Sequence, residues 1–127
     1  MIVQTRKKEL KKKVAKVAAD PIRKLKIWIL FPYLESEDPN LQYYYDFTQS
    51  LAEYKKIFDE LGADWTWQPV TMKNFKEVIA SIKKKSGRKI PLVLNLCDGD
   101  EVNGTPGVSV IHELDKSRLI YTGSDDH

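Results

Sequence analysis

The chain has 127 residues, of which 42% are hydrophobic and 10% aromatic, so its composition suits one folded domain rather than a disordered segment. Its single cysteine, Cys97, excludes an internal disulfide and a cysteine-based zinc site. No apolar run approaches the roughly 18 residues that a membrane span needs. The N-terminus lacks the apolar core of a signal peptide, so a cytoplasmic location is expected.

Charge divides the chain into a basic extension and an acidic body. Residues 1–26 hold ten Lys or Arg and two acidic residues, whereas residues 27–127 hold eleven and sixteen. We interpret residues 1–25 as a basic helical extension, because the few apolar residues there recur at helical spacing. The simplest interpretation is a solvated extension, and the alternative is an arm that contacts RNA, a membrane or a partner.

The body alternates strand and helix signals. Residues 26–31 are nearly all apolar and predict a central strand that is covered on both faces. Residues 41–61 predict a helix that ends at Gly62, a residue suited to a left-handed C-cap. The apolar stripe of this helix steps by three and four residues: Phe47, Leu51, Tyr54, Phe58 and Leu61. Residues 64–70 alternate in polarity and predict an edge strand, since Pro69 limits pairing.

A second helix is predicted over residues 72–85, with Thr71 as its N-cap. Its buried stripe consists of Phe75, Val78, Ile79 and Ile82. Residues 90–96 form another apolar run and predict a second central strand. A short helix over residues 106–116, with Thr105 as N-cap, and a last strand over residues 119–121 complete the body.

The order βαβαβαβ predicts an α/β, Rossmann-like three-layer domain over residues 26–127. We expect a four-stranded parallel sheet in the order 2-1-3-4, preceded by the basic helix. The point where the strand order reverses then lies between the strands at residues 26–31 and 90–96. Ligands of open α/β sheets bind beyond the carboxyl ends of the strands at such a point.

The loop over residues 95–107, named here the acidic loop, follows one of these strands. It carries Asp98, Asp100 and Glu101, and it has neither a dinucleotide fingerprint nor a phosphate loop. Its charge favours a substrate ammonium or a divalent metal, whereas the N-terminus of the following helix favours a carboxylate. An amino acid satisfies both preferences. The alternative is an ordinary surface loop whose acidic side chains cap turns.

The single cysteine and the two histidines are not expected to take part in chemistry. Cys97 is expected to be a buried small hydrophobe rather than a nucleophile, and neither His112 nor His127 is assigned a catalytic role. We therefore assign no catalytic residue. A phosphoryl-accepting receiver domain is disfavoured, because the strand at residues 90–96 ends in Asn95 rather than an aspartate.

Three segments carry a family resemblance: LVLNLCDG at residues 92–99, NGTPGVSVI at 103–111 and IYTGS at 120–124. Together they resemble the N-terminal (pre-ATP-grasp) domain of D-alanine–D-alanine ligase-like ATP-grasp enzymes, and the resemblance extends over about residues 25–124. It implies that ATP phosphorylates a substrate carboxylate and that the amine of a second substrate attacks the acylphosphate. It also implies that this domain binds the first, amino-acid-like substrate and contributes to a homodimer interface.

The resemblance implies that a substrate site in this chain is lined by four residues: Glu35, Glu37, Asp98 and Gly99. It also implies that the backbone near Gly104 and Gly107 orients the substrate carboxylate. Asp98-Gly99 stands where the family usually has His-Gly, which indicates a substrate other than D-alanine.

The resemblance also bears on cofactors and partners. ATP and magnesium are expected in the complete family enzyme, in ATP-grasp domains supplied in cis or in trans. The chain is therefore expected to be a fragment that binds no cofactor and is inactive alone. The alternative is a stand-alone flavodoxin-like interaction module that uses the basic arm for an acidic partner. Neither a membrane span nor a nucleic-acid partner is expected.

Overall fold

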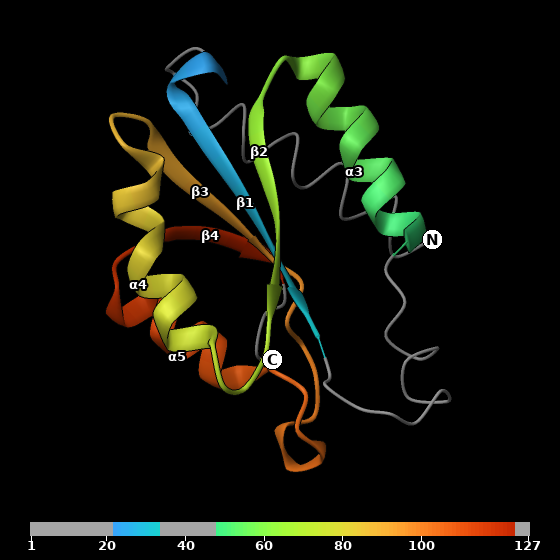
Figure 1. Cartoon of the computed structure of the whole chain (residues 1–127), viewed down its shortest axis with the longest axis vertical. Helices are drawn as coiled ribbons and strands as arrows, with labels where there is room; N and C mark the ends of the chain where they lie inside the picture. Colours follow the sequence, from blue (N-terminus) through green and yellow to red (C-terminus); the bar gives the residue numbers. More distant parts are fainter. Residues whose placement is uncertain (1–21, 34–47, 124–127) are drawn as a thin grey trace.

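Four parallel strands form one sheet in the order β2-β1-β3-β4 (Figure 1). The strands are β1 (Leu25–Pro32), β2 (Asp64–Val70), β3 (Ile90–Asn95) and β4 (Ile120–Gly123). The computed structural model describes residues 22–33 and 48–123. Within them, the α/β class, the parallel sheet and the strand order all confirm the prediction from sequence.

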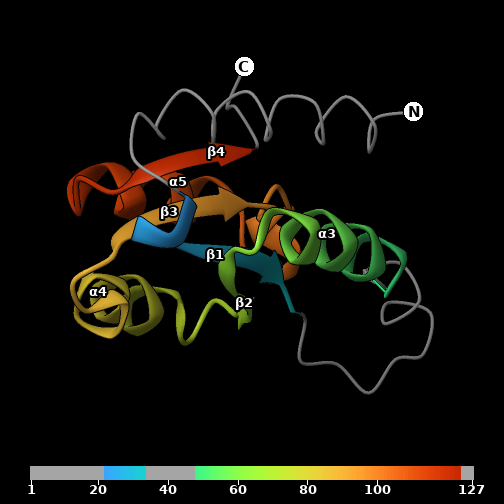
Figure 2. The same cartoon turned by 90° about the horizontal axis from the view of Figure 1, so that it is seen from above.

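Helices cover both faces of the sheet, which makes the three layers (Figure 2). Helix α3 (Thr48–Leu61) lies on one face, and α4 (Phe75–Ser86) and α5 (Val108–Lys116) lie on the other. Two single 3-10 turns, η1 (Ile22–Lys24) and η2 (Glu101–Asn103), flank the sheet. The basic helix predicted at the N-terminus, and the beginning of the helix predicted from residue 41, lie outside the described residues.

Strand β1 sits at the centre and contributes to two cores. Leu25, Ile27 and Ile29 pack against α3, whereas Trp28 and Leu30 pack against α4 and α5. Successive side chains of a strand point to opposite faces, so a strand covered on both sides must be apolar throughout. This requirement is the physical origin of the continuous apolar run in the sequence.

The buried stripe of α3 differs in part from the prediction. Tyr54 and Phe58 are buried as expected, and Ile57 is buried as well. Leu61 was predicted to be buried, but it is 37% exposed, because it is the last residue of the helix. Gly62 follows with φ of +67°, which confirms the left-handed C-cap.

Helix α4 begins at Phe75, three residues later than predicted. A turn precedes it, in which Thr71 Oγ1 accepts hydrogen bonds from the backbone N–H groups of Lys73 and Asn74. The Asn74 side chain accepts in return from Thr71 N–H at 2.7 Å. Thr71 therefore caps the turn that leads into the helix, in a reciprocal arrangement like a capping box, and is not the N-cap of α4 itself.

A buried polar contact joins α4 to the central strand. Trp28 Nε1 donates a hydrogen bond of 2.9 Å to Ser86 Oγ, and Ser86 Oγ donates one of 2.7 Å to the carbonyl of Ile82. Both side chains are buried. Since a buried indole N–H needs a partner, Ser86 allows Trp28 to occupy the core.

We expect Ser86→Ala to lower the free energy of unfolding by about 1–3 kcal/mol, because it leaves the Trp28 N–H unsatisfied in the core. Urea unfolding followed by tryptophan fluorescence measures the change. Ser81→Ala is the matched control on the same helix, since Ser81 is half-buried and bonds only its own helix, to the carbonyl of Val78. Equal effects of the two substitutions would contradict a specific role for the Trp28–Ser86 bond.

Candidate functional site

The acidic loop lies at the carboxyl edge of the sheet, at the lower end of Figure 1. Strand β3 delivers it there, because its last residue, Asn95, pairs with Leu30 near the end of β1. In this strand order, β1 and β3 flank the point where the direction of winding reverses. The loop thus occupies the position at which parallel sheets bind ligands.

Close backbone contacts hold the two ends of the acidic loop together. Gly99 N–H donates to the carbonyl of Pro106 at 2.9 Å, and Thr105 N–H donates to the carbonyl of Asp100 at 3.2 Å. A Cβ atom on Gly107 would overlap the Gly99 carbonyl, and one on Gly99 would overlap the Thr105 side chain. Glycine is required at position 107 because backbone approaches backbone there, and at position 99 because the buried Thr105 side chain fills the space of a Cβ.

Glu101 closes the loop onto the N-terminus of α5. Its Oε2 atom accepts hydrogen bonds from Gly107 N–H at 3.1 Å and Ser109 N–H at 2.9 Å, and its Oε1 atom accepts from Ser109 Oγ at 2.7 Å. The first N–H groups of a helix have no partner within the helix and carry partial positive charge. A carboxylate from the chain itself therefore occupies the place that the sequence predicted for a substrate carboxylate.

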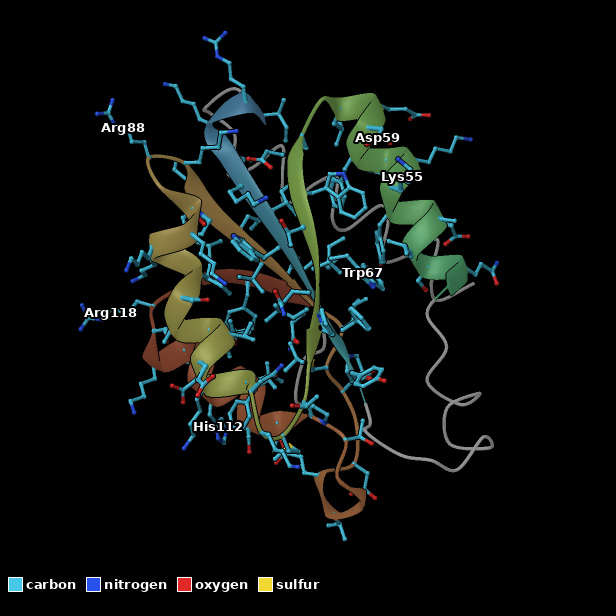
Figure 3. The ribbon with its side chains drawn as sticks, in the orientation of Figure 1. Lys55, Asp59, Trp67, Arg88, His112 and Arg118 are labelled. Carbon is cyan, nitrogen blue, oxygen red and sulfur yellow. The ribbon has the colours of Figure 1, made fainter. Side chains whose placement is uncertain are left out.

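Electrostatics agree with this geometry. Burial alone would raise the pKa of Glu101, but the hydrogen bonds from Ser109 and Gly107 and the charge of His112 together hold it below its ordinary value of 4.5. His112 is exposed on α5, at the same end of the molecule as the loop (Figure 3). Glu101 consequently stays ionised, and hydrogen-bonded to α5, at neutral pH.

The capping role corrects the predicted start of α5. The helix begins at Val108 rather than residue 106, and the residue at its N-cap is Gly107, which has no side chain to cap it. Thr105 was predicted as the N-cap, but it lies two residues before Gly107 and its hydroxyl has no hydrogen-bond partner among the described residues. Glu101, from the far side of the loop, performs the capping instead.

The other two acidic residues of the loop are exposed. Asp100 is the N-cap of η2, where its side chain accepts a hydrogen bond from Val102 N–H at 3.0 Å. Asp98 lies directly before Gly99, at the point where the loop leaves the strand. The carboxylates of Asp98 and Asp100 are thus at the surface, whereas that of Glu101 is directed to α5.

Two polar atoms are buried beneath the loop without a partner among the described residues: Asn95 Nδ2 and Thr105 Oγ1. Both residues are fully buried. Asn95 uses its other side-chain atom, Oδ1, to accept a hydrogen bond from Cys97 N–H at 3.0 Å. Buried polar groups are usually satisfied, so two such groups in one short segment are unusual.

Cys97 is buried, as predicted. Burial raises the pKa of its thiol, and the neighbouring charge of Asp98 raises it further. A thiol in this state is protonated at neutral pH and is a poor nucleophile. The predicted burial of Cys97 is therefore confirmed.

The predicted site residues are placed as follows. Gly99 and Gly107 lie in contact, Asp98 lies next to Gly99, and Gly104 ends η2 with φ of +86°. Glu35 and Glu37 lie outside the described residues, so their place in the site stays a prediction. Sequence reasoning missed the role of Glu101, together with Asn95, Thr105 and Ser109, because no local pattern links them.

Every backbone N–H between residues 104 and 107 is already used. Gly104 N–H donates to the carbonyl of Glu101, Thr105 N–H to that of Asp100, and Gly107 N–H to the Glu101 side chain, while Pro106 has none. Of these groups, only the Gly107 N–H is bonded to the Glu101 side chain, so only this N–H would become available to a ligand carboxylate if that side chain moved away. The exchange of one carboxylate for another would conserve the hydrogen bonds of Gly107 and Ser109.

Comparisons with known proteins do not assign the chain to a family: no family model, no curated protein and no solved structure gives a significant match. Within residues 22–33 and 48–123, no three His, Cys, Asp or Glu side chains converge as metal ligands would. Over the same residues, no helix has both the length and the apolar character to cross a bilayer.

We expect Glu101→Ala to lower the free energy of unfolding by about 0.5–2 kcal/mol at pH 7, because it removes the cap of α5. The pKa of Glu101 is depressed in the folded state, so its stabilising contribution is present above pH 4.5 and is lost as the pH falls through the folded-state value. Urea unfolding from pH 7 to pH 3 measures this contribution.

The control for this prediction is Glu113→Ala, which removes a glutamate from the body of the same helix. The loss of stability on acidification should be smaller in Glu101→Ala than in either wild type or the control. A wild-type pH profile in Glu101→Ala would contradict the assigned role of Glu101.

Proposed function

We propose that this chain is the substrate-side domain of an ATP-dependent carboxylate–amine ligase and that it binds an amino-acid-like ligand at the acidic loop. The observation that carries the proposal is the position of the loop: an acidic segment and a helix N-terminus that meet at the switch point of a parallel sheet. The segments that resemble the ligase-like family form β3, the acidic loop, α5 and β4, the elements that build this position.

The ligand is recognised at both of its charged ends. Its ammonium lies near Asp98, which is exposed next to the contact between Gly99 and Gly107. Its carboxylate replaces Glu101 at the N–H groups of Gly107 and Ser109, which already hold a carboxylate with good geometry. When the loop opens for this exchange, Asn95 Nδ2 and the Thr105 hydroxyl become available as further donors.

ATP and magnesium are not assigned to the described residues. They include neither a glycine-rich phosphate loop nor a cluster of metal ligands. In the family that the sequence resembles, this chemistry belongs to the ATP-grasp domains, so the contribution proposed for this chain is to bind and orient the first substrate. The alternative of a stand-alone interaction module is favoured by a separate observation, the basic side chains at the opposite edge of the sheet.

The test is a titration of the ¹⁵N-labelled chain with a panel of L- and D-amino acids, followed by the amide shifts. Shifts should concentrate on Gly99, Gly107 and Ser109. Asp98→Asn should weaken binding about 3- to 10-fold, because it removes the charge that attracts the ammonium. Glu101→Gln should tighten binding, because the internal competitor loses its charge.

The two substitutions thus have opposite expected signs, which a general loss of stability cannot produce. Asp115→Asn is the control, since Asp115 lies at the far end of α5, where it bonds Tyr121. If no amino acid shifts the loop amides, or if both substitutions at the loop weaken binding equally, the proposed site is wrong.

A further inference from the structure

Basic side chains gather at the amino edge of the sheet, opposite the acidic loop. They come from η1, from the last turn of α4 and from the turn that follows it: Arg23, Lys24, Lys83, Lys84, Lys85, Arg88 and Lys89. The pairing of Leu25 with Ile90 brings η1 and this turn together. We name these seven residues the basic edge surface.

The centre of the basic edge surface is concave. An open hollow of about 560 Å³ is lined by four of its side chains and one aliphatic residue: Arg23, Lys24, Arg88, Lys89 and Ile90. Arg88 extends outward from the upper end of the molecule (Figure 3). The four cations therefore line one shared depression that is accessible from solvent.

Within the described residues, this positive charge is neutralised only in part. Asp64 pairs with Lys89 at 3.0 Å and with Lys26 at 2.8 Å, and the two lysines lower the pKa of Asp64. Over the same described part of the chain, neither Arg23 nor Arg88 forms an ion pair. Clustered like charges disfavour the folded state, and a bound polyanion would relieve their repulsion.

We propose that the basic edge surface binds the phosphate backbone of a nucleic-acid duplex. Arginine offers a planar fork that matches phosphate oxygens, and two arginines lie in the hollow. A concave basic surface fits the convex, densely charged backbone of a duplex. The contacts are to phosphate and carry no sequence information.

Two other anionic partners fit less well. A membrane surface needs apolar side chains that insert, and single strands usually stack their bases on aromatic rings. None of the large hydrophobic side chains that are exposed among the described residues lines the hollow: Tyr33, Leu61, Val102, Val108 and Ile120. The hollow therefore offers four cationic side chains and one half-buried aliphatic residue, Ile90, without an exposed aromatic ring on which a base could stack, and such a surface suits a duplex backbone.

The course of the chain strengthens this assignment. The sequence before η1 is also basic, since residues 1–21 carry seven Lys or Arg against two acidic residues. Within the described residues, η1 lies beside a second basic segment that is more than 50 residues further along the chain.

The test uses the full chain and fluorescence anisotropy with labelled duplexes, one of DNA and one of RNA, each about 20 base pairs long, so that several phosphates are available. The variant Arg23→Gln/Lys24→Gln/Arg88→Gln removes three charges from the hollow. It should weaken binding about 100- to 1,000-fold at about 50 mM salt and lower the slope of log Kd against log salt by about 3.

The control variant Lys56→Gln/Lys73→Gln/Lys76→Gln removes the same charge from exposed lysines on α3 and at the start of α4. It should retain most of the affinity and of the salt slope. If the two variants lost duplex affinity equally, the effect would depend on net charge alone and not on the hollow, which would overturn the proposal. Absence of duplex binding, or tighter binding to phosphatidylserine vesicles than to either duplex, would also overturn it. Preference for RNA or for DNA identifies the source of the backbone.

Discussion

The pairing of β1 with β3 determines where both charged surfaces of this molecule lie. At one end of the pair Leu25 faces Ile90, which places η1 beside the turn after α4, and at the other end Leu30 faces Asn95, from which the acidic loop departs. A one-residue slip of β1 would turn Trp28 toward α3 and away from its partner Ser86. Because both faces of β1 are buried in packed cores, such a slip is costly, and the two edges are held in fixed positions.

The two edges manage their charge differently. At the carboxyl edge, the carboxylate of Glu101 accepts hydrogen bonds from N–H groups at the N-terminus of α5. These bonds hold the acidic loop closed. At the amino edge, positive side chains point outward, and Asp64 is the acidic residue that moderates them. At the carboxyl edge a carboxylate is satisfied by backbone N–H groups, whereas at the amino edge a carboxylate is satisfied by two lysines.

The strands and their order could be predicted because each depends on a strong local signal: continuous apolar runs for β1 and β3, alternation for β2, and helices between them. The closing contact of the loop could not be predicted in this way. Glu101 reaches N–H groups six and eight residues further along, across a loop that closes through Gly99 and Gly107. Rules for helix caps consider the residue just before the helix. Thr105 satisfies that preference for a helix predicted from residue 106, but in the structure the N-cap is Gly107 and Thr105 makes no capping contact.

The closed loop has a consequence for ligand affinity. In the proposed function, a ligand carboxylate competes with Glu101, which is tethered beside the same donors, so the apparent affinity falls in proportion to the fraction of molecules in which the loop is open. A preference of about 1.4 kcal/mol for the closed state lowers that affinity about tenfold. Under the same proposal, Asn95 Nδ2 and Thr105 Oγ1, which have no hydrogen-bond partner among the described residues, would offer the ligand further hydrogen bonds once Glu101 has moved away.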